Sequence, residues 1–278
     1  MGQLDGKVAF ITGAARGQGR SHAIRLAAEG ADIIATDICK QIDSVGYPLA
    51  GPDDLAETVR QVEALDRRIV AHEVDVRDSA GMRAAVDDGV ARLGRLDIVC
   101  ANAGIATFGT VADMTDEMWD DMIEVNLSGA FRTVRATIGH LKKNEHGGAI
   151  VLTSSAAGLK AVPNLAHYAA AKHGLGGFLK TLALELAPFN IRVNAVNPTS
   201  VNTDMIHNQH TYDMFRPDLP AGTATVEDVV VGFKASNVLP VKWVEPDDVS
   251  NAILWLVSDA ARYVTGVQLP IDAGAVIK

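Results

Sequence analysis

The sequence has 278 residues, 48% of them hydrophobic and 21% charged, and it favours one globular domain with a substantial core. Its 34 acidic residues outnumber its 25 lysines and arginines, and the formal charge of −9 argues against binding to nucleic acids or anionic membranes. The apolar runs are shorter than the roughly 18 residues that span a bilayer, so no transmembrane segment is expected. We expect a cytoplasmic protein, because Met1–Lys7 lack the pattern of a secretion signal.

Short β-rich runs alternate with longer Ala-rich segments along the whole chain. Strands are expected near residues 7–12, 31–37, 69–74, 96–101, 148–153 and 191–196, each followed by sequence compatible with a helix. The runs are almost continuously apolar, as is typical of strands buried on both faces. The pattern predicts a doubly wound, parallel α/β sheet of the Rossmann type, in a single domain over residues 1–278.

The first strand is followed by a glycine-rich turn. Gly13, Gly17 and Gly19 surround Arg16 and Gln18, and a helix-compatible run comes directly after them. Such a turn lets the backbone approach a pyrophosphate and directs helix N–H groups at it. The alternative is a tight turn that needs glycine only for positive φ.

Asp37 ends the second apolar run, 18 residues after Gly19. A carboxylate there accepts hydrogen bonds from the adenosine ribose hydroxyls and repels a 2′-phosphate, which predicts NAD rather than NADP. Arg16 favours NADP instead, since a guanidinium in the turn could pair with that phosphate. The alternative for Asp37 is an exposed turn residue at a strand end.

Two long segments interrupt the alternation. Residues 38–52 form an insertion between the second strand and the next helix, much longer than the roughly 2–6 residues of an ordinary βα loop. Residues 198–225 form a second irregular stretch, which carries Met and aromatic side chains and suits a hydrophobic substrate lid. For the insertion, a mobile surface loop remains the alternative to a flap over the cofactor.

Tyr168 and Lys172 stand four residues apart in a predicted helix, and so share one face. An ammonium about 4 Å from the phenol would lower its pKa by about 3 units at an effective dielectric near 20. Ser155, at the end of the fifth predicted strand, lies 13 residues upstream and meets Tyr168 at the carboxyl edge of the sheet. Asn126 lies in an otherwise amphipathic helix, where a polar residue satisfied by the backbone is the alternative.

Together these residues resemble the short-chain dehydrogenase/reductase family in its single-domain form, over essentially the whole chain. The resemblance implies that Tyr168 is the general acid/base and that Ser155 orients the substrate oxygen. It also implies that Lys172 binds the nicotinamide ribose and lowers the Tyr168 pKa, and that Asn126 holds a water in a proton relay. The motifs that carry it, in chain order, are the run TGAARGQG at 12–19, Asp37, Asp75-Val76, Asn102-Ala103-Gly104, Asn126, Ser155, Tyr168 and Lys172.

The same resemblance implies contacts to the dinucleotide. Asp75 and Val76 would border the adenine, and Ile11, Asn102 and Thr203 would contact the rest of the cofactor. Pro198-Thr-Ser departs from the Pro-Gly usual in the family, which leaves the nicotinamide contacts there less defined. The predicted cofactor-binding set is completed by Gly13, Arg16, Gly17, Gln18, Gly19, Asp37, Ala103, Gly104, Tyr168, Lys172 and Pro198.

A narrower resemblance, to the mycofactocin-associated subgroup that includes carveol dehydrogenases, rests on the run Ala15–Ala23 and the insertion at 38–52. It implies NAD held so tightly that an external redox carrier, mycofactocin, must reoxidise it. The family resemblance further implies a homotetramer, with the helix at 167–187 at one interface.

The function expected is NAD-dependent oxidation of a hydrophobic, carveol- or terpenoid-like secondary alcohol to a ketone. The alternatives are a ketone reductase with exchangeable cofactor, acting on acyl-carrier or steroid-like substrates, and a non-catalytic redox sensor. No metal is expected, because the histidine pair His207 and His210 is more simply explained as solvated loop residues. The two cysteines, Cys39 and Cys100, support neither a disulfide framework nor a zinc site.

Overall fold

A parallel sheet of seven strands forms the centre of the computed structural model, which describes residues 2–278. The strand order is β3-β2-β1-β4-β5-β6-β7, so the chain reverses its direction of growth at β1. Such a reversal opens a ligand crevice at the carboxyl ends of the strands. The strands are β1 (Val8–Thr12), β2 (Asp32–Asp37), β3 (Ile69–Glu73), β4 (Ile98–Ala101), β5 (Gly148–Thr153), β6 (Ile191–Pro198) and β7 (Gln268–Ile271).

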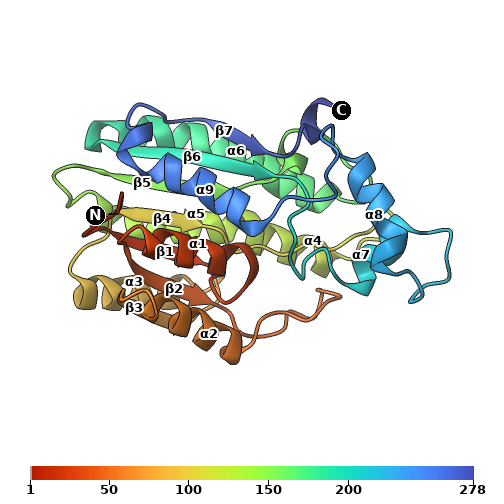
Figure 1. Ribbon diagram of the computed structural model, residues 1–278, viewed down its shortest axis with the longest axis horizontal. Helices are drawn as coiled ribbons and strands as arrows, with labels where there is room; N and C mark the ends of the chain where they lie inside the picture. The colour runs from red at the N-terminus through yellow and green to blue at the C-terminus, as the bar shows by residue number, and fades with distance from the viewer. Residues whose placement is uncertain (1) are drawn as a thin grey trace.

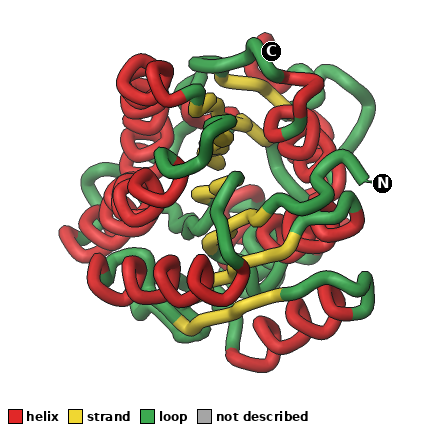
Figure 2. The backbone as a smooth tube through the Cα atoms, turned by 90° about the vertical axis from the view of Figure 1, so that its left-hand side faces the viewer, coloured by secondary structure: helices red, strands yellow, loops and turns green. Residues whose placement is uncertain are grey.

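Helices cover both faces of the sheet (Figures 1 and 2). One layer consists of α1 (Gly17–Ala28), α2 (Pro52–Glu63) and α9 (Pro246–Val257). The other consists of α3 (Ser79–Leu93), α5 (Gly129–Leu141) and α6 (Ala166–Leu186). This three-layer arrangement confirms the predicted fold class.

The strand β1 shows why the apolar runs are continuous. All five of its residues are buried, with Val8 and Phe10 packed in the core on the α5 and α6 side, and Ala9 and Ile11 in the core on the α1 and α9 side. Successive side chains point to opposite faces, and both faces are covered by helices. An alternating apolar and polar pattern would leave polar groups in one of the two cores.

The strand β7 was missed by the sequence prediction. It is short, contains Pro270 and lies at the sheet edge with its residues partly exposed, so it lacks a buried strand's apolar signature. The six predicted strands are present, and β6 extends two residues further, to Pro198.

The carboxyl end of the sheet is built up by three shorter helices. These are α4 (Asp116–Ile123), α7 (Gln209–Phe215) and α8 (Val226–Ala235), and α7 and α8 lie beyond the strands at one end of the molecule (Figure 1). The expected lid at 198–225 is therefore partly helical. Short 3₁₀ turns occur at Ala156–Gly158, Ala187–Phe189, Asp259–Ala261 and Ala275–Ile277. Among residues 2–278, no helix is both long and apolar enough to cross a membrane.

Candidate active site

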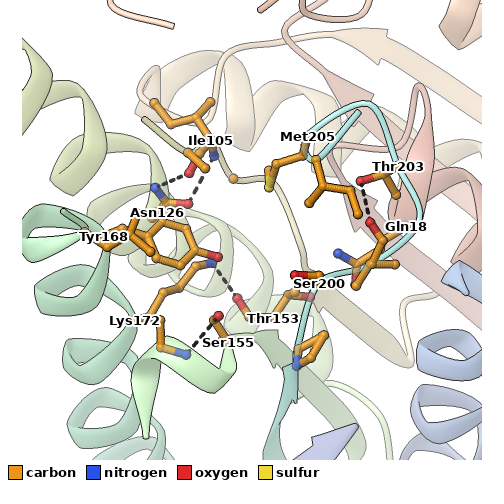
Figure 3. Close-up of a pocket in the computed structure, with 18 of the residues that line it drawn as sticks. Gln18, Ile105, Asn126, Thr153, Ser155, Tyr168, Lys172, Ser200, Thr203 and Met205 are labelled. Atoms are coloured by element: carbon orange, nitrogen blue, oxygen red, sulfur yellow. Dashed lines mark hydrogen bonds between the residues drawn. The ribbon is translucent and has the colours of Figure 1, made fainter. Parts of the chain in front are cut away.

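A cavity of about 760 Å³ opens at the carboxyl ends of the strands, between the glycine-rich turn and the start of α6. Of the residues predicted for the site, all but Ile11 line this cavity. Ile11 is fully buried in the core beneath the turn, so it supports the site from below. Figure 3 shows Tyr168, Lys172 and Asn126 across the cavity from Gln18 and Thr203.

The glycine-rich turn has the shape that a pyrophosphate requires. Gly13 and Gly17 have φ of +67° and +53°, and a Cβ at Gly19 would collide with the Gly13 carbonyl. The turn leads directly into α1, whose first N–H groups have no intrahelical partner. Thr58 supports the turn from α2, since its hydroxyl donates to the Ala14 carbonyl at 2.9 Å.

Asp37 lies beside the glycine-rich turn, and together they form the cradle for a dinucleotide. It is 8% exposed, and its carboxylate accepts the backbone N–H groups of Ala15 at 3.0 Å and Cys39 at 3.1 Å. Burial nevertheless raises its pKa above the ordinary aspartate value. The Gln18 side-chain oxygen is buried and has no hydrogen-bond partner within residues 2–278. A cradle with a carboxylate at one end and an unpartnered amide oxygen in its wall fits a dinucleotide.

Arg16 does not extend freely toward a ribose phosphate. Its guanidinium donates to the Pro48 carbonyl at 2.6 Å and forms an ion pair with Asp204 at 2.9 Å. It therefore joins the glycine-rich turn to both the insertion and the lid. Because these contacts engage the guanidinium, Arg16 is a weaker argument for NADP than its charge alone suggested.

The insertion at 38–52 is folded against the rest of the molecule. The Gln41 side chain donates to the carbonyls of Val45 and Tyr47, at 2.9 and 3.2 Å, and accepts the Leu49 N–H at 3.0 Å. Tyr47 is 4% exposed and lines the cavity. At Gly46 an added Cβ would stand 3.3 Å from the ring of His210, so the insertion meets the lid.

Tyr168 and Lys172 come from the first two turns of α6. Lys172 is 3% exposed, and its ammonium donates to the Thr153 carbonyl at 2.8 Å and stands 5.5 Å from the centre of the Tyr168 ring. Ser155 begins the 3₁₀ turn that follows β5, where its hydroxyl accepts the Ala157 N–H at 3.1 Å. Ser155 and Tyr168 both line the cavity. The predicted Ser–Tyr–Lys constellation is thus assembled at the sheet edge.

Burial shifts the pKa of both Tyr168 and Lys172. Burial raises the pKa of Tyr168, and the hydrogen bond from Ser155 opposes the rise. Burial also lowers the pKa of Lys172 to about 7. Desolvation of the charged forms is the largest cause of both shifts, and the expected lowering of the Tyr168 pKa by Lys172 stays a prediction.

Asn126 is presented by a break in the helix. The segment Glu124–Ser128 between α4 and α5 is a π-helical turn, where a regular amphipathic helix was expected. The Asn126 amide donates to the Ile105 carbonyl at 3.1 Å and accepts the Ile105 N–H at 3.2 Å. These bonds fix the side chain at the cavity wall, consistent with the placement of π turns at functional sites.

Three histidines have structural roles around the cavity. His167, at the start of α6, bonds to the Thr107 hydroxyl at 2.7 Å and ties the loop after β4 to the catalytic helix. His207 bonds to Asn202 at 2.7 Å, and the rings of His210 and Phe108 lie 5.4 Å apart. The expectation that the lid histidines are simply solvated was wrong, because both pack against neighbours. Residues 2–278 contain no group of three or more metal-ligating side chains placed to hold an ion.

Comparison with known proteins identifies the family of the chain. The model of the short chain dehydrogenase family matches residues 7–213. The chain is 51% identical over 279 residues to the (−)-trans-carveol dehydrogenase of Rhodococcus erythropolis, covering 100% of both.

Two solved structures are similar along their whole length. Carveol dehydrogenase from Mycobacterium avium in complex with NAD is 53% identical, with a TM-score of 0.97 and 100% of both chains covered. A short chain dehydrogenase from Mycobacterium paratuberculosis bound to NAD is 44% identical, with a TM-score of 0.88 and the same coverage. They confirm the predicted enzyme class and the prediction of NAD. The chain belongs to the short-chain dehydrogenase family of oxidoreductases.

Proposed function

We propose that the protein oxidises a hydrophobic secondary alcohol, carveol- or terpenoid-like, to the ketone with NAD as the oxidant. The observation that carries the proposal is the meeting of Tyr168, Ser155 and Lys172 in one cavity with a dinucleotide cradle ending at Asp37. A proton acceptor beside a hydride acceptor is what alcohol oxidation needs. A redox sensor has no use for such an acceptor, so the cavity argues against the non-catalytic alternative.

Each residue of the Ser–Tyr–Lys constellation has its own role in the proposed reaction. Ser155 and Tyr168 hold the alcohol oxygen between two hydroxyls, and Tyr168 accepts its proton. NAD, when bound, would supply the hydride acceptor for the carbinol carbon. Lys172 would hold its ribose hydroxyls, and the Lys172 ammonium would supply positive charge beside the forming phenolate.

A proton path leads away from Tyr168. A Cβ at Gly104 would lie 2.6 Å from the Asn126 side-chain oxygen and 3.6 Å from the Lys172 nitrogen, so both groups flank the same short backbone segment. With a pKa of about 7, Lys172 can both gain and lose a proton near neutral pH. We assign Lys172 and Asn126 to the relay, with Asn126 holding its water.

The lid supplies an apolar surface over the substrate. Met205, Met214 and Phe215 line the cavity, together with Phe108 from the loop after β4. Apolar side chains with few polar groups favour a hydrophobic ring over a sugar or a small polar alcohol. The names of the similar carveol dehydrogenases agree with that choice.

We also propose that NAD is retained through many turnovers and reoxidised by an external carrier such as mycofactocin. The insertion and the lid meet over the cavity at Gly46 and His210, and Arg16 bonds to both. Release of the cofactor would require these contacts to break, which slows dissociation without changing the chemistry.

One experiment tests the whole proposal. Cyclic and terpenoid alcohols are screened once with added NAD and once with an artificial electron acceptor, after mass spectrometry of the acid-denatured supernatant. Bound nicotinamide and turnover that needs the acceptor support retained NAD. A cofactor-free preparation that cycles rapidly on added NAD contradicts retention and leaves alcohol oxidation standing.

A ketone reductase with exchangeable cofactor is the second candidate. Its specific support is the raised pKa of Tyr168, because a neutral phenol is the form that donates a proton to a carbonyl. Reduction of the matching ketones with added NADH at rates above alcohol oxidation would favour it.

A further inference from the structure

Ser154 is a buried serine that stands between two residues of the active site. It follows Thr153, the last residue of β5, and precedes Ser155, and it is 2% exposed. A buried hydroxyl needs a hydrogen-bond partner, because its desolvation is otherwise uncompensated. The Ser154 hydroxyl donates to the main-chain carbonyl of Lys172 at 3.0 Å. The end of β5 is therefore tied to α6 at the residue that carries the active-site ammonium.

Lys172 is held at two points by neighbouring residues of the same segment. Its ammonium donates to the Thr153 carbonyl at 2.8 Å (Figure 3), and its own carbonyl accepts the Ser154 hydroxyl. A lysine side chain is a flexible four-carbon stem, so a contact at the ammonium alone would leave the helix backbone free to move. The contact at the carbonyl fixes that backbone, and with it the place of Tyr168 one helical turn earlier.

The 3₁₀ turn after Ser155 makes room for this contact because it ends in glycine. A Cβ at Gly158 would lie 2.5 Å from the Ser154 hydroxyl oxygen and 2.9 Å from the Lys172 carbonyl oxygen. Both distances are shorter than a van der Waals contact, so a side chain there would force the turn and α6 apart. Closely packed backbone thus surrounds the bond between Ser154 and Lys172.

The strand β6 fixes the other side of this segment. The Ser154 N–H donates to the Val196 carbonyl at 2.8 Å, and the fully buried Asn197 donates its side-chain N–H to the Ser155 carbonyl at 2.9 Å. These bonds give Ser154 and Ser155 a fixed place on the sheet that does not depend on α6. The Ser154 hydroxyl then relates that fixed place to Lys172.

We propose that Ser154 is a positioning residue, whose hydroxyl sets the separation between Ser155 and the two catalytic side chains of α6. The inference rests on the proposed alcohol oxidation and adds to it a residue that acts through Lys172. Reaction between positioned groups slows steeply when a misplacement of about 1 Å is introduced. Loss of the hydroxyl should therefore slow the chemical step and leave the affinity for NAD unchanged.

Ser154→Ala removes the hydroxyl, and Thr137→Val is its matched control. Thr137 is fully buried on α5, its hydroxyl donates to the Thr133 carbonyl at 3.0 Å, and it does not line the cavity. Both variants should lower the melting temperature by similar amounts, because each loses a buried hydroxyl that donates to a backbone carbonyl. We expect kcat for carveol with NAD to fall about tenfold or more in Ser154→Ala alone. NAD affinity in calorimetry should change less than twofold in both.

Gly158→Ala disturbs the same separation by adding an atom instead of removing one. The new Cβ pushes α6 away from the turn while the Ser154 hydroxyl remains, so kcat should fall here too. Gly177→Ala is the control, because Gly177 lies on the same helix and an added Cβ there meets nothing within 4 Å. If Ser154→Ala does not fold, the comparison of these two glycine variants decides alone.

A titration of Lys172 separates this inference from the proposed function. The ¹³C shift of its Cε, assigned by the signal lost in Lys172→Met, reports the pKa without turnover. Burial holds that pKa at about 7, so looser packing of α6 admits water and should raise it toward the ordinary lysine value. We expect this rise in Ser154→Ala and Gly158→Ala and in neither control.

Three results overturn the positioning role. They are a wild-type kcat with an unshifted titration in the two variants, a loss of kcat that the controls share, and a loss explained by weaker NAD binding. A wild type that leaves carveol unoxidised contradicts the proposed function instead, and the titration then decides the role of Ser154.

Discussion

Arg16 in the glycine-rich turn and Asp204 in the lid form an ion pair of 2.9 Å across the mouth of the cofactor cleft. The same guanidinium donates to the carbonyl of Pro48 in the insertion. One side chain thus joins three segments that are far apart in sequence.

Removing this link should accelerate cofactor release. Asp204→Asn breaks only the ion pair, whose carboxylate is 65% exposed, and an exposed pair is worth at most about 1 kcal/mol. We expect NADH to dissociate roughly two- to fivefold faster in this variant. Arg16→Met also removes the charge-assisted bond to Pro48, so we expect an increase of about tenfold or more.

Stopped-flow fluorescence of NADH displaced by excess NAD measures both rates. Arg83→Met is the control, since Arg83 is exposed on α3 and does not line the cavity. Wild-type rates in both cleft variants would show that the insertion and lid do not limit release.

Tyr168→Phe should abolish most of the catalysis while leaving cofactor binding intact. The variant removes only the hydroxyl that accepts the substrate proton, and general-base catalysis contributes about 10²–10⁴-fold. We therefore expect kcat to fall by about that factor, with NAD affinity changed less than twofold in calorimetry. Turnover at the wild-type rate would refute the assignment of Tyr168.

The pH dependence of oxidation should depend on Ser155. Burial raises the pKa of Tyr168, so the reactive phenolate gains population as pH increases and kcat/KM should rise into the alkaline range. The hydrogen bond from Ser155 favours the phenolate, and its loss in Ser155→Ala raises the pKa further. The alkaline limb of the profile should therefore move to higher pH in the variant. A shift to lower pH would contradict this account.

The sequence predicted the fold well where local pattern and burial agree. The run Val8–Thr12 is apolar throughout because two helical layers cover it, and the same logic found the other buried strands. It could not find β7, since a half-exposed edge strand with Pro270 carries no such pattern. The helix α7 was hidden inside the lid by its shortness, at Gln209–Phe215.

The catalytic residues of the candidate site could be predicted because their spacing in the sequence is fixed by the fold. Tyr168, Lys172 and Ser155 meet as expected because strand ends and helix starts converge at one edge of the sheet. Electrostatics were not predictable in the same way. The pKa values of Tyr168 and Lys172 depend on burial, which only the packed structure gives.

We expect a homotetramer, with α5 and α6 at one interface. Phe131 on α5 is 43% exposed and Leu184 on α6 is 79% exposed, so these helices present apolar side chains that a partner copy would cover. Leu184→Glu should shift the sedimentation profile toward smaller species at micromolar concentration. Val231→Glu is the matched control, because Val231 is 73% exposed on α8. A wild-type protein that sediments as a stable monomer would contradict the expectation.

Asp37→Ala should weaken NAD binding and relax discrimination against NADP. The carboxylate is held at the cradle's end by the N–H groups of Ala15 and Cys39, and its loss removes the acceptor for the ribose hydroxyls and the charge that repels a 2′-phosphate. We expect NAD affinity to fall about tenfold or more, in line with the loss of charge-assisted hydrogen bonds. Because Arg16 is engaged with Pro48 and Asp204, NADP should gain less than a free guanidinium would give. Calorimetry with both nucleotides checks this against Asp53→Ala, an exposed residue of α2 that does not line the cavity. A wild-type protein that already prefers NADP would overturn the role given to Asp37.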